Sequence, residues 1–594
     1  MNFVRDASAG DGSGTVSPAL VREQVARILR SPSFVQVPTL GRLLQYLVDR
    51  TVEGETGQLK EYAVGVEVFG RGPSFDPRTD TIVRVHARRL RKRLEQYYAG
   101  DGRADSILVE LPKGHYSVHC RPLLPHQASV AAEGYPSIVV LPFANLSGDS
   151  ENEYFADGLT DEIISALAAI PDLRVVARTS AFQFKGRGED IRNIGRALGV
   201  QLALEGSVRR DGRSIRVAVQ LIDAGDGFHR WSQTFERHLT SIFTVQDEIS
   251  GAIVDTLRSR FDTSNPTVRP AVPVSAEAHD CYLKARYFWN RATPEDVAKA
   301  IRSFEQAIAL DPGYAAAHAG LADAFVFMAT VESEAPGPLI DAARKSARAA
   351  LDLHDLAEAH SAMGAVLGMG DWDWIGAERE FRIALDLMPS FAHARGAYAV
   401  GSLAPLRRYD EAIDQLRLAI GFDPLSVFLR TMLAQILILA GRLREAVDEL
   451  RHALELDGVY APATLSLAWA YIGHANFAAA LDLLEHVPVS TRAFPNFSGH
   501  LGYAHARLGH RQQAEDVLRA LLERFPGPWM PGVDVGAIYN GLGDTGLALH
   551  WLERAHDLHS FDVTFVFDDP RFANLRSDPR LARLGKRAPE GVGQ

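Results

Sequence analysis

The hydrophobic positions of residues 276–560 recur with the period of a repeated helix pair. A small, a large and a second small residue follow one another as Ala300, Phe304 and Ala307, and Pro312 comes five residues later. After a longer first step, the pattern restarts every 34 or 35 residues, at Ala343, Ala377, Ala412, Ala446, Ala480, Ala514 and Ala548. Small residues let two antiparallel helices approach, and proline cannot continue a helix. The spacing therefore predicts about eight stacked helix pairs, an α-solenoid.

A 34-residue repeat with this small–large–small pattern is the tetratricopeptide signature, and the segment resembles that family. Such arrays bury a continuous core by stacking and present a concave surface to peptides or partner helices. We therefore expect an unknown protein or peptide partner to bind residues 276–560. The alternative is an array that only spaces or dimerises the chain. Residues 561–594, which include Asp569-Pro-Arg-Phe572, resemble the cap or tail that follows such arrays.

Residues 137–262 alternate between apolar runs and amphipathic stretches, which predicts a small α/β domain. Asp211 and Gly212 separate two of its apolar runs and predict a hairpin turn. Proline-rich stretches flank the domain and predict linkers over 123–136 and 263–275. The expected strands cover 137–143, 173–177, 202–210, 214–222 and 227–235, and the expected helices cover 155–167, 191–198 and 244–254.

An amphipathic helix is predicted near the N-terminus, over residues 81–98. Val83, Ala87, Leu90 and Leu94 form one apolar stripe at helical spacing. Residues 106–118 predict a hairpin with Pro112-Lys113-Gly114 at its tip, and residues 1–18 predict a disordered tail. Two further apolar helices are expected over 40–47 and 62–69. Around its other faces the amphipathic helix carries Arg84, His86, Arg88, Arg89, Arg91, Lys92 and Arg93 against one acid, Glu95.

These basic side chains suit contact with double-stranded DNA. Guanidinium groups can offer paired donors to base edges and positive charge to phosphates. The residues nearest the N-terminal end of the helix are expected to reach bases, and the later ones with the hairpin tip are expected to bind phosphates. The alternative is a solvated basic face on an ordinary helix. The candidate DNA-binding residues are Arg84, His86 and Arg88 for bases, and Arg89, Arg91, Lys92 and Lys113 for the backbone.

The order of helices and hairpin over 19–122 resembles the OmpR/PhoB-type winged helix, above all the versions joined to TolB-like and tetratricopeptide segments in bacterial regulators. His86, Arg89, Leu90, Arg91 and Leu94 match the end of that family's recognition helix. Two features depart from the family: Pro112 and Lys113 stand where its wing usually has an arginine before a glycine-rich turn, and no receiver domain precedes the helix. The strings Leu-Glu-Gly-Ser-Val and Val-Gln-Asp-Glu-Ile resemble the noncatalytic TolB N-terminal-like domain. The expected fold class is thus multidomain, α+β and all-α: winged helix, small α/β domain, then α-solenoid.

Charge is distributed unevenly along the chain. The whole sequence has 63 Lys and Arg against 74 Asp and Glu, a formal charge of −11, whereas residues 1–125 carry 18 against 14, or +4. DNA contact should therefore concentrate in the first domain. Two cysteines, Cys120 and Cys281, cannot form a disulfide framework. With no signal peptide, and with residues 121–135 too polar to span a bilayer, we expect a cytoplasmic protein without membrane contact.

Motifs of catalysis are missing from the sequence. It has no phosphate-binding P-loop, no Gly-x-Ser-x-Gly, no His-Glu-x-x-His and no Cys-x-x-Cys. His115, His119 and Cys120 could share a metal but lack a fourth ligand. Related chains attach nucleotide-cyclase domains to similar C-terminal parts, and no such domain is expected here. We predict no catalytic residue, cofactor or metal, and a DNA-binding transcription regulator with a sensing array. A noncatalytic scaffold whose winged helix serves docking or dimerisation is the alternative, and a homodimer is left open.

Overall fold

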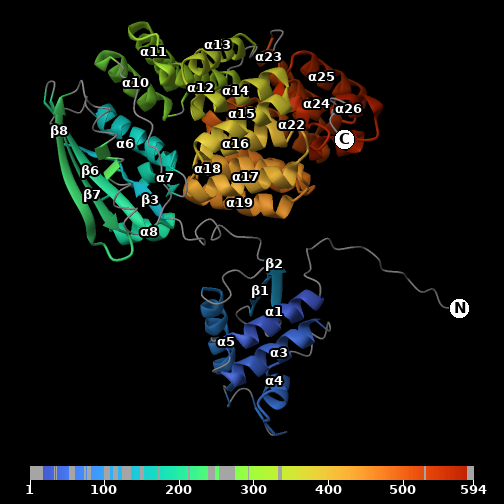
Figure 1. Cartoon of the computed structure of the whole chain (residues 1–594). Coiled ribbons are helices and arrows are strands. Elements are labelled where there is room, and N and C mark those ends of the chain that lie inside the picture. Colours follow the sequence, from blue (N-terminus) through green and yellow to red (C-terminus); the bar gives the residue numbers. More distant parts are fainter. Residues whose placement is uncertain are drawn as a thin grey trace, which may run out of the picture. The chain divides into compact units, whose positions relative to one another are not determined.

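The computed structural model describes residues 18–31, 34, 37–52, 60–72, 75–76, 80, 82–99, 107–111, 118–122, 136–147, 153–170, 173–211, 214–238, 248–249, 251–252, 275–291, 293–331, 337–526 and 530–584. They fall into two compact units, residues 1–132 and 133–594 (Figure 1). The expected tail over 1–18 and the linkers over 123–136 and 263–275 lie almost wholly outside the described residues.

The first unit consists of four described helices and a two-stranded sheet. The helices are α1 (Pro18–Arg30), α3 (Pro38–Val52), α4 (Glu61–Glu67) and α5 (Ile82–Ala99), and the strands are β1 (Ile107–Glu110) and β2 (His119–Pro122). The core joins the apolar faces of α1, α3, α4 and α5 to Val109, Leu111 and Val118 next to the strands. The predicted stripe of α5 is buried in this core, which confirms the amphipathic helix.

The hairpin differs in register from the one predicted over 106–118. β1 and β2 pair in antiparallel fashion from Ile107 opposite Pro122 to Glu110 opposite His119. The second strand therefore starts at His119, farther from the tip than predicted. The reason is that Leu111 and Val118 are buried in the core, which anchors both arms below the tip. Residues 112–117, with Lys113, lie outside the described residues.

The second unit begins with a mixed six-stranded sheet. Its strands are β3 (Ser137–Val140), β4 (Ala144–Asn145), β5 (Arg174–Val175), β6 (Leu202–Asp211), β7 (Ser214–Asp223) and β8 (His229–His238). The order is β5-β3-β6-β7-β8, with β4 beside β6. β5, β3 and β6 run parallel, whereas β6, β7 and β8 are antiparallel. Asp211 pairs with Ser214, which confirms the predicted hairpin.

Helices cover both faces of this sheet. α6 (Glu153–Ala168) packs on Ile138 and Val140, while α7 (Arg178–Ala181) and α8 (Ile191–Leu198) pack on Val139 and Leu141 (Figure 1). Successive residues of β3 thus enter opposite cores, which explains its unbroken apolar run. The predicted last strand, 227–235, is displaced to His229–His238 because Gly227 takes a φ of 80° in the turn before it. Of the predicted helix 244–254, only 248–249 and 251–252 are described, and they are helical.

Eight helix pairs follow along the described part of the chain. The repeat alanines lie in the second helix of each pair, and all eight are 0% exposed. Ser, Thr, Asp or Asn side chains cap the starts of α10, α11, α15, α18, α21 and α25. The pairs are α10 (Ala276–Trp289) with α11 (Pro294–Leu310), α12 (Ala315–Val331) with α13 (Gly337–Leu353), α14 (Ala357–Ala365) with α15 (Trp374–Leu387), α16 (Ala392–Tyr398) with α17 (Tyr409–Phe422), α18 (Val427–Leu439) with α19 (Leu443–Leu456), α20 (Ala461–Gly473) with α21 (Phe477–Glu485), α22 (Pro495–Arg507) with α23 (Arg511–Arg524), and α24 (Gly532–Gly541) with α25 (Thr545–Asp557).

Two π-helical turns, η5 (Val366–Asp371) and η6 (Ala399–Leu403), extend α14 and α16. They approach closely, because a Cβ on Gly368 would collide with the carbonyl oxygen of Gly401. Ser402 donates a 2.8 Å hydrogen bond to the carbonyl oxygen of Trp374. The third and fourth pairs are thus joined through backbone contacts that the repeat spacing did not predict.

After the last pair, residues 561–584 fold back onto the array. They form η8 (Phe561–Phe565), η9 (Pro570–Leu575) and α26 (Pro579–Leu584). Val563, Phe572 and Leu581 are buried in one cluster with side chains of α20, α22, α24 and α25. The segment expected as a cap is therefore part of the core of the last pairs.

Candidate nucleic-acid interface and partner surfaces

Helix α5 is the candidate DNA-binding element, and its start is fixed by Asp80. The Asp80 carboxylate accepts a 3.0 Å hydrogen bond from the backbone N–H of Ile82, which satisfies a donor at the helix N-terminus. From there Val83, Ala87 and Leu90 turn into the core. The helix is therefore held along one side, and its opposite side carries the basic residues.

The exposed strip of α5 contains Arg88, Arg89 and Lys92. Arg88 and Lys92 are four residues apart and Arg89 and Lys92 three, so their side chains are neighbours on the helix surface. Arg91 and Arg93 are only half-exposed. Three positive charges thus share one accessible face, which can approach a phosphate backbone or a groove.

Arg84, expected to read bases, forms an ion pair with α4. Its Nε donates to Glu61 Oε1 at 2.9 Å and to Oε2 at 3.1 Å. The Arg84 side chain is 53% exposed, so the pair is a surface interaction of modest energy. It orients Arg84 toward α4 in the free protein.

His86 and Arg91 also have partners within the first unit. His86 Nδ1 lies 2.8 Å from the carbonyl oxygen of Ile82, and its ring packs 4.7 Å from that of Phe69. Arg91 Nε donates a 2.8 Å hydrogen bond to the carbonyl oxygen of Leu111, at the end of β1. The two residues therefore fix α5 against its surroundings, and Arg91 ties it to the hairpin. The remaining candidate, Lys113, lies outside the described residues.

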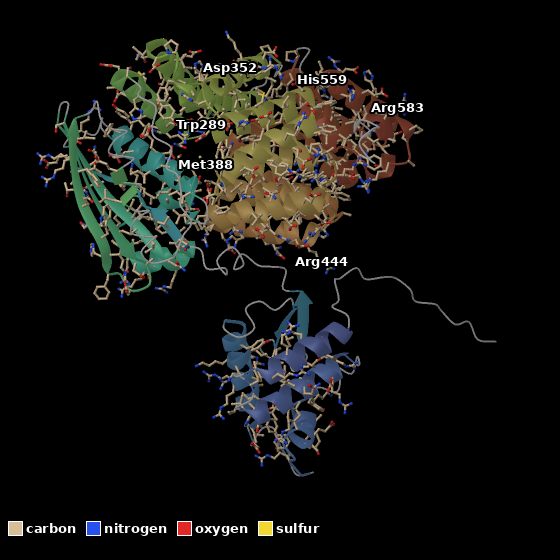
Figure 2. All side chains as sticks on the ribbon, viewed as in Figure 1. Trp289, Asp352, Met388, Arg444, His559 and Arg583 are labelled. Atoms are coloured by element: carbon tan, nitrogen blue, oxygen red, sulfur yellow. The ribbon has the colours of Figure 1, made fainter. Side chains whose placement is uncertain are left out.

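The α/β domain contacts the array at the turns that follow α15 and α17, through apolar packing and hydrogen bonds. Ser180 donates to Asp423 Oδ1 at 2.5 Å and accepts from the N–H of Leu425 at 2.9 Å. The N–H of Ala177 donates to the carbonyl oxygen of Phe422 at 2.9 Å. Met388 is buried in the same cluster as the sheet residues (Figure 2). Although the sequence predicts two domains, they form one compact unit in the structure.

Buried acids lie where α6 meets α10. Asp161 accepts a 2.8 Å bond from Arg286 and lies 3.8 Å from Arg178; burial works against its charge, but the two guanidinium groups lower its pKa. Burial raises the pKa of neighbouring Glu162 to about 8, and the charge of Asp161 adds to the rise while Arg286 opposes it. His279 Nε2 is 3.5 Å from Glu162, and burial lowers the pKa of this histidine to about 4.

We expect this junction to lose stability as pH rises. Glu162 binds a proton more tightly in the folded chain than in the unfolded one. Its contribution to the free energy of unfolding is therefore complete below pH 4.5, the ordinary pKa of a glutamate, and is lost as pH rises to about 8. Glu162→Gln imitates the protonated acid and should match the wild type near pH 5, yet melt several degrees higher at pH 8. Thermal unfolding at both values tests this.

The matched control is Glu277→Gln, an exposed acid in the first turn of α10. It should leave the pH dependence of melting unchanged. A Glu162→Gln variant that follows the wild-type curve at every pH would show that Glu162 does not titrate in this range.

The C-terminal segment contacts the first helices of the last three pairs. Arg571 lies between Asp569, at 2.7 Å, and Asp534 of α24, at 3.0 Å. Trp469 of α20 donates a 3.0 Å hydrogen bond to Asp569, and Asn540 of α24 donates a 2.7 Å bond to the carbonyl oxygen of Arg571. The segment therefore covers surface that the first helices of the array would otherwise present.

A second set of contacts links this segment to earlier pairs. Tyr409 donates a 2.7 Å hydrogen bond to Asp568, and Arg407 forms a 3.0 Å ion pair with the same carboxylate. The ring of Trp372 stacks 4.8 Å from that of His559. The chain after the last helix pair therefore contacts the third and fourth pairs as well as the last three.

Among the described ranges, no group of three or more His, Cys, Asp or Glu side chains is arranged to hold a metal ion. Of the three residues considered as ligands, His115 lies outside the described residues, and the side chain of Cys120 is not described. No described helix combines the length and apolar character needed to cross a membrane.

Residues 429–460, which span α18 and α19, match the family model described as Tetratricopeptide repeat. The chain is also similar to a protein of Rhizobium meliloti (strain 1021) named "Putative adenylate cyclase 3", at 43% identity over 187 residues. The match covers 31% of this chain and 32% of the relative, so it spans about a third of that protein's length.

Several solved structures resemble the chain. They include a tetratricopeptide repeat protein from Parabacteroides merdae ATCC 43184, at 14% identity and a TM-score of 0.33, covering 46% of this chain and 100% of that one. Pseudomonas aeruginosa pilF is 19% identical with a TM-score of 0.27, and the match covers 35% of this chain and 92% of that one. The human IFIT1 dimer with m7Gppp-AAAA is 16% identical with a TM-score of 0.35, and the match covers 53% of this chain and 78% of that one. The sequence match and the helix pairs together show that the chain contains tetratricopeptide repeats.

Proposed function

We propose that the protein is a noncatalytic, sequence-specific DNA-binding transcription regulator whose first unit contacts duplex DNA through α5. The observation that supports this most is the exposed strip of Arg88, Arg89 and Lys92, opposite a buried apolar stripe and beside a two-stranded hairpin. The resemblance of residues 19–122 to the OmpR/PhoB-type winged helix points the same way. Because bacterial chromosomal DNA lies in the cytoplasm, this proposal also places the protein in the cytoplasm.

Within this proposal the seven candidate residues have different roles. Arg88 is the base reader, and Arg89 and Lys92 bind phosphates. Arg84, His86 and Arg91 position the helix, because each has a partner inside the unit. The sequence alone predicts that Arg84 and His86 contact bases and that Arg91 contacts phosphates. Their contacts within the first unit favour a positioning role for all three instead. Lys113 stays a phosphate-binding candidate on sequence grounds alone.

Selection from a randomised duplex library with the full chain tests the proposal. We expect one enriched site, bound with an affinity that falls as salt rises, with a slope of about −0.9 per phosphate neutralised. Arg88→Ala should cost about 1–3 kcal/mol on that site and broaden the selected sequences. Lys92→Ala should weaken all duplexes alike and serves as the matched comparison. A library that stays random after selection by the wild type would contradict DNA recognition.

We further propose that the array senses or recruits a protein partner, as tetratricopeptide repeats commonly present concave binding surfaces. The α/β domain and residues 561–584 already contact parts of the array, so a partner must use the remaining surface or displace one of them. A scaffold in which the first unit serves docking is the second candidate, and the repeat match alone favours it. The relative named as a putative adenylate cyclase matches this chain over a third of its own length, and that match favours neither candidate.

A further inference from the structure

The outer edge of the mixed sheet is formed by β8, which pairs with β7 on one side, and among the described residues no strand pairs with its other side (Figure 1). β8 has ten residues, His229–His238, which is long for an edge strand. An open edge presents unpaired backbone N–H and C=O groups, and proteins usually protect it with lysine, proline or inward-pointing charge. β8 contains neither lysine nor proline, and its charged residues are Arg230, Glu236 and Arg237. Its one irregularity is a register shift near its start, opposite Leu221 and Ile222.

Residues 230–236 of β8 are chemically symmetric about Gln233. The strand has the order Arg230-Trp-Ser-Gln-Thr-Phe-Glu236: a cation, an aromatic ring, a hydroxyl, the central amide, a hydroxyl, an aromatic ring and an anion. In a two-fold antiparallel pairing centred on Gln233, each of these residues would face its complement in a second copy. Aromatic pairs, hydroxyl pairs and opposite charges are the cross-strand pairs that stabilise a sheet.

Side-chain exposure at this edge fits such a partner. Ser232, Gln233 and Thr234 are exposed, Trp231 is half-buried at the border of the core, and Phe235 is 3% exposed within it. Phe228, just before β8, is 70% exposed, which leaves a large apolar side chain beside the edge. Arg230 forms ion pairs with Asp226 and with Asp223, which is 16% exposed, and Glu236 forms one with Arg216. The pairs with Asp226 and Arg216 lie on the surface and are weak enough to be exchanged for partners in another copy.

We propose that β8 is a self-association surface, through which two copies of the chain pair antiparallel about Gln233 and join their sheets into one. The pairing is isologous, so a single patch serves both copies. It does not depend on DNA binding and would hold equally for a scaffold.

The symmetry gives a sharp test at Gln233, because this residue faces itself in the dimer. Gln233→Lys and Gln233→Glu each place two like charges together, and each should raise the dimer dissociation constant of the full chain by roughly tenfold or more. An equimolar mixture of the two variants should dimerise at least as tightly as the wild type. Sedimentation velocity over a range of concentrations measures all three, at low salt on protein freed of nucleic acid by nuclease treatment, because high salt would screen the charges.

Gln512→Lys, on the exposed surface of α23, is the matched control and should dimerise like the wild type. As a second measurement, Gln233→Cys should form a disulfide-linked dimer on mild oxidation, whereas the wild type, with Cys120 and Cys281, should not. A monomeric wild type would overturn the proposal. So would single variants that dimerise normally, or a mixture that stays as weak as its components.

Discussion

Replacing Arg88, Arg89 and Lys92 together by alanine should lower the affinity of the full chain for duplex DNA by roughly a hundredfold or more. The three side chains form the exposed strip of α5, so their removal takes away both charge and hydrogen-bond donors from one face. The salt dependence should also become shallower, because fewer counterions are released on binding. Fluorescence anisotropy with a labelled duplex at several salt concentrations measures both effects.

The matched control removes the same charge from the array. Arg444→Ala, Arg451→Ala and Arg511→Ala change exposed residues of α19 and α23 and should leave DNA affinity within a few fold. Alanine favours helix, so neither triple variant should unfold its helix, and circular dichroism can verify this. Equal losses in both triple variants would mean that bulk charge, and not α5, governs binding.

Local patterns predicted the elements of this protein well. The stripe of Val83, Ala87, Leu90 and Leu94 identified the buried side of α5, because helical spacing alone decides which residues share a face. The repeat alanines were identified for the same reason: a tight helix–helix contact tolerates only a small side chain. Strand ends were less accurate, since the register of β2 depends on Leu111 and Val118 reaching the core.

Contacts between distant segments could not be predicted in this way. Nothing in the sequence around Arg84 indicates Glu61, which lies 23 residues earlier and on another helix. Ser180 and Asp423 are 243 residues apart, and only the folded chain brings them together. For the last segment a signal was present, because Asp569-Pro-Arg-Phe572 combines two charges with an aromatic residue. This signal predicts a cap, and nothing in it predicts that Arg571 is buried.

Arg571→Met should destabilise the end of the array by about 3–5 kcal/mol, since it leaves buried carboxylates without their cation. In the wild type the Arg571 guanidinium bonds Asp569 and Asp534, and all three side chains are buried. Burial already raises the pKa of Asp534 to about 6, with Arg571 opposing the rise. Without Arg571, folding should therefore become more favourable as pH falls.

Hydrogen exchange is the appropriate measurement, because a unit of this size need not unfold in one step. Amides of α24 and residues 570–575 should lose protection in Arg571→Met, whereas those of the first unit should not change. Asp534→Asn added to Arg571→Met should restore part of the protection, because the amide leaves one buried charge fewer. The control, Arg583→Met, removes an exposed arginine of the same segment and should change stability by about 0.5 kcal/mol or less. If Arg571→Met exchanged like this control, the segment would be held by apolar packing alone, and the ion pairs would contribute nothing to its position on the array.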